Sequence, residues 1–488
     1  MLPFKDLIKI NSRSDTAAYL QIGNGFVQLI RQGRLKRGMK LPGSRELASL
    51  LKVNRMTVVA AFNELAAQGW IEMLPRKGAF VKMILPLLTP SHVTTTSEVF
   101  SIATNTGFRY KENKVIPRQH GDFPLTDKLV FNDGFPDVRM APVEHLAKTM
   151  RRLSRLSSQK KYLMYGGTQG TPMLRQVLSS FLNETRGLTS TPENILITRG
   201  AQMGLYLAAS VILQPGDVVV TGSPGYGMAD LTFQQVGARL LHVPVDDKGI
   251  DVEKLEAISQ RQKIKMVYVI PHHHNPTTVT LSSERRVQLL ALAAKYKFAI
   301  IEDDYDYDFH YASKPIMPMA SIDRNGYVVY VGTFTKTLAP AIRFGFMVAP
   351  ESFIHAATGL RKLIDTQGDS LVENAIAELY KDGTMARHIK KSVNIYRERR
   401  DHFCDLLQSE LGKYLSFDIP AGGMSVWTKF QKSDLTIVAA RASKKRLIIR
   451  DGSDYDEGKI KYNAVRLGFA SLNFNEQLKA IEILKTCL

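Results

Sequence analysis

The sequence predicts an α/β fold with a mostly parallel sheet, preceded by a small N-terminal domain of helices and a β-hairpin. Beyond residue 129, short β-rich runs alternate with helical stretches, a pattern typical of a parallel sheet covered by helices on both faces. Residues 10–82 show helical periodicity and then two short strands around a turn. Between them, residues 83–128 are rich in Thr, Ser, Pro and Asn and lack periodicity, which indicates a linker. The predicted domains are therefore 10–82 and 129–488.

Length and composition exclude several classes of protein. A chain of 488 residues with 44% hydrophobic and 23% charged residues is expected to form two or more globular domains. Its apolar stretches are far shorter than the roughly 20 residues that span a membrane, and its first residues lack the layout of a signal peptide. Its two cysteines, Cys404 and Cys487, are too few for a disulfide framework, which favours a reducing cytoplasm.

Positive charge is concentrated near the N-terminus. The chain has a net charge of +19, and residues 1–85 hold 14 Lys and Arg against 5 Asp and Glu. This concentration predicts a polyanionic partner for the N-terminal domain, with a solvated basic face as the alternative.

The N-terminal domain is expected to contain helices followed by a hairpin. Apolar residues at helical spacing, followed by a glycine, mark the first long helix: Ile22, Phe26, Leu29, Ile30 and Gly33. Ser44 is predicted to cap a short helix that ends at Leu51, and Asn54 is predicted to cap the next helix. Residues 71–74 and 79–82 are expected to pair across the turn between them.

Polar residues follow the predicted strands of the α/β domain, which are 195–198, 218–221, 266–270, 299–301 and 328–331. Ligands of such sheets bind beyond the carboxyl ends of the strands. After the first run come Gly200, Ala201 and Gln202, which open a helix whose free backbone N–H groups suit a phosphate. The later runs are followed by an aromatic ring, a polar loop, a carboxylate with a tyrosine, and a lysine with an arginine: Tyr226, residues 272–275, Asp303, Tyr305, Thr333, Thr335, Lys336 and Arg343.

One cofactor, pyridoxal phosphate (PLP), needs this combination of groups. It takes a lysine for its aldimine, a carboxylate against its pyridine nitrogen, donors around its phosphate and a ring to stack on. The loops after the predicted strands supply each of these groups, so the sequence predicts PLP as the cofactor.

Two segments of this region resemble a known family. Residues 301–306 (IEDDYD) and 330–340 (YVGTFTKTLAP) closely resemble motifs of the MocR/GabR subfamily of GntR-type transcription regulators, and residues 129–488 resemble a fold-type I aminotransferase. The resemblance implies that Lys336 forms the Schiff base and that Asp303 pairs with the ring nitrogen. It assigns the remaining cofactor contacts to the phenolic oxygen (Tyr305, Asn275), the ring face (Tyr226) and the phosphate (Gly200, Ala201, Gln202, Thr333, Thr335, Arg343).

The resemblance also implies a second subunit and a ligand carboxylate. Tyr165, in the segment YGGTQG, resembles the tyrosine that reaches the cofactor phosphate of the other subunit, which implies a homodimer. Arg466, in the segment VRLGF, matches the arginine that clamps a substrate carboxylate. Met228 stands where some γ-aminobutyrate-responsive members have an arginine, so γ-aminobutyrate is not implied as the ligand. Thr278 stands where a glycine is usual, which allows a differently shaped turn there.

The N-terminal domain resembles a GntR winged helix-turn-helix in residues 33–48 and 53–58. In such domains the N-terminal end of a recognition helix meets base edges and phosphates in the major groove of operator DNA. The resemblance therefore places six residues against DNA: Arg45, Asn54, Arg55, Thr57 and, at the tip of the wing, Lys77 and Gly78.

Other interpretations of single residues stay open. Lys336 could be a surface lysine, Arg466 an interface arginine and Tyr226 a core side chain. Neighbours among the consecutive histidines 272–274 point to opposite faces of an extended backbone, so no metal site is expected there, although one histidine could line the pocket. The basic run 387–400 is predicted to be a solvated helix face.

Three functions fit these features. The first is a regulator that binds operator DNA through residues 10–82 and senses an amino compound through aldimine chemistry at Lys336. The second is an active PLP-dependent aminotransferase with an accessory DNA-binding domain. The third is a regulator whose effector is PLP itself. The basic winged helix favours the first and third functions over a bare aminotransferase, while the intact set of PLP residues leaves transamination open.

Overall fold

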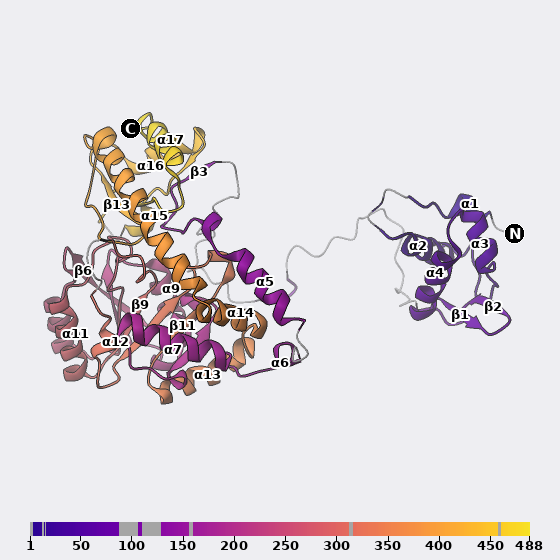
Figure 1. Cartoon of the computed structure of the whole chain (residues 1–488), viewed down its shortest axis with the longest axis horizontal. Helices are drawn as coiled ribbons and strands as arrows, with labels where there is room; N and C mark the ends of the chain where they lie inside the picture. The colour runs from indigo at the N-terminus through magenta and orange to yellow at the C-terminus, as the bar shows by residue number, and fades with distance from the viewer. Residues whose placement is uncertain are drawn as a thin grey trace. The chain divides into compact units, whose positions relative to one another are not determined.

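A computed structural model of the chain describes residues 3–11, 14, 16–86, 106–109, 128–155, 160–311, 316–456 and 460–488. The chain divides into two compact units, Met1–Lys111 and Glu112–Leu488 (Figure 1). Most of the predicted linker, residues 83–128, lies outside the described residues. No helix in the described part of the chain is long and apolar enough to cross a bilayer.

The described residues of the N-terminal unit form four helices and a hairpin: α1 Phe4–Leu7, α2 Ala18–Arg31, α3 Ser44–Leu51, α4 Arg55–Ala67, β1 Ile71–Leu74 and β2 Gly78–Val81. Helix α2 buries its predicted apolar face, and strands β1 and β2 pair in antiparallel register. Asn54 caps α4 as predicted, because its side chain accepts from the Met56 N–H. The predicted cap at Ser44 is wrong: α3 begins at Ser44 itself, and Gly43 holds the cap position without a side-chain bond.

The second unit is built on an eight-stranded sheet with the strand order β4-β11-β10-β9-β8-β5-β6-β7. The strands are β4 Ile195–Thr198, β5 Val218–Ser223, β6 Arg239–Asp246, β7 Gly249–Ile250, β8 Met266–Val269, β9 Ala299–Asp304, β10 Val328–Thr333 and β11 Gly345–Val348. Strands β6, β5, β8, β9 and β10 run parallel, whereas β11 is antiparallel to both of its neighbours and β7 is antiparallel to β6. The prediction of a mostly parallel α/β sheet is confirmed.

Helices cover the sheet and extend beyond it: α5 Val143–Leu153, α6 Lys160–Leu163, α7 Pro172–Arg186, α8 Ala201–Ile212, α9 Gly227–Gln235, α10 Val252–Arg261, α11 Ser283–Tyr296, α12 Met319–Ile322, α13 Glu351–Asp365, α14 Ser370–Lys381, α15 Thr384–Leu406, α16 Leu435–Lys444 and α17 Phe474–Lys485. Alternate residues of β10 face different cores, as expected for a strand buried on both faces. Val329 and Val331 pack in a core with α8, while Tyr330 packs in a core with α7.

The C-terminal part of this unit has its own small sheets. Strands β12 Leu415–Phe417, β13 Ser425–Phe430 and β15 Ala464–Gly468 form an antiparallel sheet, and β14 Leu447–Ile448 pairs in parallel with β3 Leu129–Val130. In Figure 1 these strands gather with α16 and α17 at one end of the unit. Through β3, the segment after the predicted linker therefore joins the same substructure as Arg466, which lies on β15.

Candidate functional site

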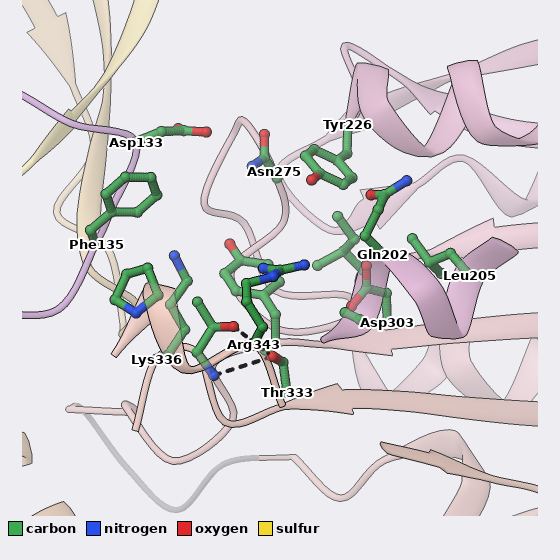
Figure 2. A pocket seen from close by; sticks show the side chains of 15 residues that line it. Asp133, Phe135, Gln202, Leu205, Tyr226, Asn275, Asp303, Thr333, Lys336 and Arg343 are labelled. Atoms are coloured by element: carbon green, nitrogen blue, oxygen red, sulfur yellow. Dashed lines mark hydrogen bonds between the residues drawn. The ribbon is translucent and has the colours of Figure 1, made fainter. Parts of the chain in front are cut away.

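A cavity of about 250 Å³ lies where strands β8, β9 and β10 end (Figure 2). Its lining comes from loops after the strands, from the start of α8, and from the segment between β3 and α5: Asp133, Phe135, Ala201, Gln202, Leu205, Tyr226, Ile270, Asn275, Asp303, Tyr305, Thr333, Thr335, Lys336, Pro340 and Arg343. The structure thus brings together most of the side chains that the sequence analysis selected for a cofactor. Gly200, Tyr165 and Arg466 are not among the lining residues.

Lys336 follows strand β10 and reaches into the cavity (Figure 2). Its Nζ donates to the carbonyl of Gly134 at 2.5 Å, and it lies 5.1 Å from the centre of the Phe135 ring. Burial lowers the pKa of Lys336 to about 8, and the positive charge of Arg466 adds to the shift. A lysine with a lowered pKa is partly neutral near physiological pH, so its amine is a competent nucleophile.

Asp303 is a buried carboxylate with one oxygen unpartnered. It lies near the end of β9, and its Oδ2 accepts from the Tyr268 hydroxyl at 2.8 Å. No atom in the described part of the chain donates to its Oδ1. Burial raises the pKa of Asp303 to about 7; the Tyr268 hydrogen bond opposes this shift, and the charges of Asp304 and Asp306 add to it. A cationic N–H donor facing Oδ1 would satisfy this oxygen and stabilise the ionised form.

A further part of the cavity is suited to an anion. Helix α8 begins beside it, and Gly200 caps the helix with a φ of 78°. A Cβ at Gly200 would lie 2.9 Å from Nη2 of Arg343, so a larger residue would displace this guanidinium, and the positive φ also favours glycine. Thr333 and Thr335 add hydroxyls 2.8 Å apart. Helix N–H groups, hydroxyls and an arginine together match the needs of a phosphate.

Tyr226, Asn275 and Tyr305 line the same cavity as Lys336 and Asp303. Tyr226 is the residue before α9, and its ring faces the cavity. The Tyr305 hydroxyl donates to the carbonyl of His273 at 2.8 Å and accepts from both Nη atoms of Arg466 at 3.3 Å. Together with the carboxylate, the lysine and the anion site, these residues fit a phosphorylated pyridine ring.

Arg466 lies just behind the cavity wall and is already paired. Its side chain is 2% exposed, and its Nε lies 3.0 Å from Oδ1 of Asp133 and 2.8 Å from Oγ of Ser425. Asp133 could not be predicted from the sequence, because nothing near it in the chain signals a contact with so distant a residue. Phe135, which lies beside Lys336, was missed for the same reason.

The three consecutive histidines lie outside the cavity lining. All three are buried, and each has a partner: His272 with Asp304 at 3.2 Å, His273 with Asp306 at 2.8 Å, and His274 with Thr277 at 3.0 Å. The expectation that one of them could line the pocket is therefore not met. Thr278 has a φ of 62°, so the turn after them takes the left-handed conformation that glycine favours, although the residue is a threonine.

Tyr165 lies outside the cavity of its own chain. Its side chain is 86% exposed, and it follows two other exposed apolar residues, Leu163 and Met164. This position is available to a second molecule.

The residues selected for DNA contact lie on α3, at the start of α4 and at the hairpin turn. Arg45, Arg55 and Lys77 are exposed, Gly78 has a φ of 103° at the turn, and Thr57 is half-buried. Nε of Arg55 lies 3.4 Å from Oγ of Ser44, a contact that links α4 to α3. Asn54 uses its side-chain oxygen to cap α4, which leaves its amide N–H groups for a partner.

Comparison with known proteins matches both parts of the chain to families. Residues 126–484 match "Aminotransferase class I and II", and residues 18–81 match "Bacterial regulatory proteins, gntR family". The chain is 28% identical to the probable rhizopine catabolism regulatory protein MocR of Rhizobium meliloti over 88% of this chain and 84% of that protein. It is also 28% identical to the transcriptional regulator TauR of Rhodobacter capsulatus, covering 91% of this chain and 90% of that one.

The fold matches solved aminotransferases. The α-aminoadipate aminotransferase LysN of Thermus thermophilus, solved with a phosphopyridoxyl-leucine compound, superposes with a TM-score of 0.69 and 26% identity, covering 74% of this chain and 92% of that one. An archaeal alanine:glyoxylate aminotransferase gives a TM-score of 0.70 and 30% identity, covering 74% and 90%. The chain therefore belongs to the PLP-dependent class I and II aminotransferase family, and its N-terminal gntR-family domain makes it a DNA-binding transcription regulator of the MocR/GabR subfamily.

Proposed function

We propose that this regulator senses a small amine at Lys336 and that binding of the amine changes its affinity for operator DNA. The observation that carries the proposal is that two buried groups line the same cavity. They are a lysine whose pKa is lowered to about 8 and the Asp303 carboxylate, which has an unpartnered oxygen. Their presence in one cavity supports a site that holds the cofactor and keeps its lysine chemically active.

The roles of the residues follow from the geometry of the cavity. Lys336 would hold the cofactor covalently, Asp303 would pair with its ring nitrogen, and Tyr226 would cover its ring. Asn275 and Tyr305 would face its phenolic oxygen, and the start of α8 with Thr333, Thr335 and Arg343 would bind its phosphate. When bound, PLP supplies an aldehyde carbon that accepts either the lysine amine or an incoming amine.

The proposed ligand carries a carboxylate as well as an amine. Arg466 is fixed by Ser425 and lies against Tyr305, which itself lines the cavity. A guanidinium held in this way can bind a carboxylate through two parallel hydrogen bonds. The position of Arg466 behind Tyr305 supports a compact amino acid as the ligand.

The regulator is proposed to act as a homodimer in the cytoplasm, where its operator is found. The exposed run from Leu163 to Tyr165 supports a subunit interface, and Tyr165 would extend toward the phosphate site of the other subunit. Mass measurement in solution tests the dimer. Tyr165→Phe is expected to weaken cofactor retention, since it removes one hydroxyl donor to the phosphate.

Ligand titration in the presence and absence of operator DNA tests the sensing function. Two sites that are coupled must affect each other equally, so a ligand that changes DNA affinity must bind with a different affinity when DNA is present. The cofactor absorbance is recorded while amino acids are added to the PLP-bound protein, with and without a DNA fragment from its own upstream region. The proposal expects titration midpoints that differ by about fivefold or more. Identical midpoints for every amine that alters the absorbance would contradict it.

A further inference from the structure

The carboxylate clamp of this protein is occupied by one of its own side chains. Oδ1 of Asp133 lies 3.0 Å from Nε of Arg466, and Asp133 is also a lining residue of the cofactor cavity. The hydroxyl of Tyr455 lies 3.4 Å from the same oxygen. An acidic side chain thus lies against the guanidinium to which the carboxylate of an incoming amino acid is proposed to bind.

Residues 132–135, here called the strap, are shaped to make this contact. Gly134 has a φ of 79°, and a Cβ there would lie 3.2 Å from both Nη2 of Arg466 and Oγ of Ser425. Its carbonyl accepts from Lys336. The strap is therefore closely packed against both the clamp arginine and the cofactor lysine.

Two hydrogen bonds of Asn132 hold the strap in place, one to β15 and one within the strap. The carbonyl of Asn132 accepts from the N–H of Gly468 at 2.9 Å, and its side-chain oxygen accepts from the N–H of Phe135 at 2.7 Å. Because Gly468 belongs to the same strand as Arg466, the strap is tied to β15. The backbone of the strap, and not side-chain flexibility alone, therefore holds Asp133 close to Arg466.

Asp133 and Arg466 differ in how far each side chain is exposed to water. Arg466 is 2% exposed, so its charge needs an anionic or hydrogen-bonding partner. Asp133 is 17% exposed, so its carboxylate can turn toward water when another anion takes its place. Exchange of Asp133 for a ligand carboxylate conserves the charge balance around Arg466. The exchange nevertheless requires the ligand to overcome the existing ion pair.

We propose that Asp133 is a specificity-determining residue that competes with the ligand carboxylate for Arg466. An amino acid binds by displacing Asp133 from the clamp, whereas an amine without a carboxylate leaves the pair intact. Affinity for carboxylate-bearing ligands is thereby lower than it would be without Asp133, whereas affinity for simple amines does not depend on Asp133. This inference rests on the proposed function only in placing the ligand carboxylate at Arg466.

Asp133→Asn tests the competition with three small probes on the PLP-bound protein. Propionate carries the carboxylate alone, ethylamine the amine alone, and L-alanine both. Propionate binding is measured by calorimetry, which requires no exchange at Lys336, and the two amines are measured by cofactor absorbance. Asp133→Asn is expected to bind propionate and L-alanine roughly tenfold more tightly, and to bind ethylamine with its original affinity, since only the carboxylate competes with Asp133.

Two further variants keep the test interpretable. Asp133→Ser should show the same gain if the asparagine variant does not fold. Asp246→Asn is a control. It removes a carboxylate that lies 2.6 Å from Nη1 of Arg285 and does not line the cavity, so all three affinities should stay unchanged. In Asp133→Asn combined with Arg466→Ala, the gain for propionate should disappear.

The outcomes separate this inference from the proposed function. Equal propionate affinity in the wild type and in both Asp133 variants overturns the competition, even if amines alter the absorbance. A gain for propionate without any response to amines supports the competition while contradicting amine sensing. An equal gain for ethylamine and L-alanine also overturns the inference, because the effect would then not depend on the carboxylate.

Discussion

The hydroxyl of Tyr268 donates to Oδ2 of Asp303 at 2.8 Å, while Oδ1 of the same buried carboxylate has no donor among the described residues. Tyr268 therefore fixes the orientation of the carboxylate, which lines the same cavity as Lys336. The consequences of this half-satisfied carboxylate can be measured in the absence of any ligand amine.

The protein without cofactor should lose stability as the pH rises through the titration of Asp303. Burial raises the pKa of this group from its ordinary value of 3.8 to about 7. Between these values the unfolded chain has released the proton that the folded chain still holds, so the free energy of unfolding falls with rising pH. At pH 8 the raised pKa of Asp303 lowers the free energy of unfolding by a few kcal/mol, on the order of 1.4 kcal/mol for each unit of the shift.

The comparison that isolates this contribution is wild type against Asp303→Asn, both without PLP. Glu302 also has a pKa raised by burial, to about 7, and His274 has one lowered to about 3, so the wild-type profile alone is not diagnostic. Thermal unfolding from pH 4 to pH 8 should show the stability difference between the two proteins shifting in favour of the variant. A difference that is independent of pH would contradict the raised pKa.

Lys336→Ala should abolish covalent attachment of PLP. Lys336 is the only lysine among the residues that line the cavity, so no other amine there can take its place. Borohydride reduction followed by mass spectrometry should find the cofactor mass on Lys336 in the wild type and not in the variant. Lys295→Ala, which removes an exposed lysine on α11, is the control and should retain the label. Attachment that persists in Lys336→Ala would remove the lysine from its proposed role.

Arg55→Ala should weaken operator binding by about 1–3 kcal/mol if Arg55 reads a base. Its side chain is exposed at the first turn of α4, beside Ser44 of α3. If it holds a phosphate instead, the loss should be similar for operator and unrelated DNA. Gel shifts on both DNAs distinguish these cases. Arg261→Ala, at the exposed end of α10, is a control, and equal binding by Arg55→Ala and wild type would exclude Arg55 from the interface.

Thr278→Gly should stabilise the protein by about 1 kcal/mol. Thr278 has a φ of 62°, a conformation that a β-branched residue adopts at a cost and glycine adopts freely. Thr277→Gly is a control of opposite sign, because Thr277 lacks a positive φ and hydrogen-bonds to His274. Chemical denaturation measures both. A loss of stability in Thr278→Gly would show that the packing of the threonine side chain outweighs its backbone strain.

The sequence predicted the parts of the fold and site that depend on local patterns. The five predicted strands are short β-rich runs, and the polar residues at and after their ends supplied Lys336, Asp303 and Tyr226 as candidates. Strand β11 was not predicted. Neither were the small C-terminal sheets, whose strands are two to six residues long and are defined by partners far away in the chain.

The role of Asp133 could not be predicted for a related reason. The proposed role depends on the contact between Asp133 and Arg466 of β15. Nothing near Asp133 in the sequence distinguishes it from a solvated acidic residue. The capping residue of α3 was misassigned by one position, because Gly43 and Ser44 are both acceptable caps and local sequence does not decide between them.

Operator affinity in the presence and absence of an amino acid is the decisive measurement of amine sensing by this regulator. Fluorescence anisotropy would be measured on a DNA fragment from the region upstream of the gene that encodes the protein. Wild type and Arg466→Ala would be compared, each loaded with PLP. The account predicts that an active amino acid changes wild-type affinity by about 5–150-fold and leaves the affinity of Arg466→Ala unchanged. A full response in Arg466→Ala would contradict the carboxylate clamp. A wild type whose operator affinity differs between its PLP-free and PLP-bound forms, but responds to no amine, would contradict amine sensing.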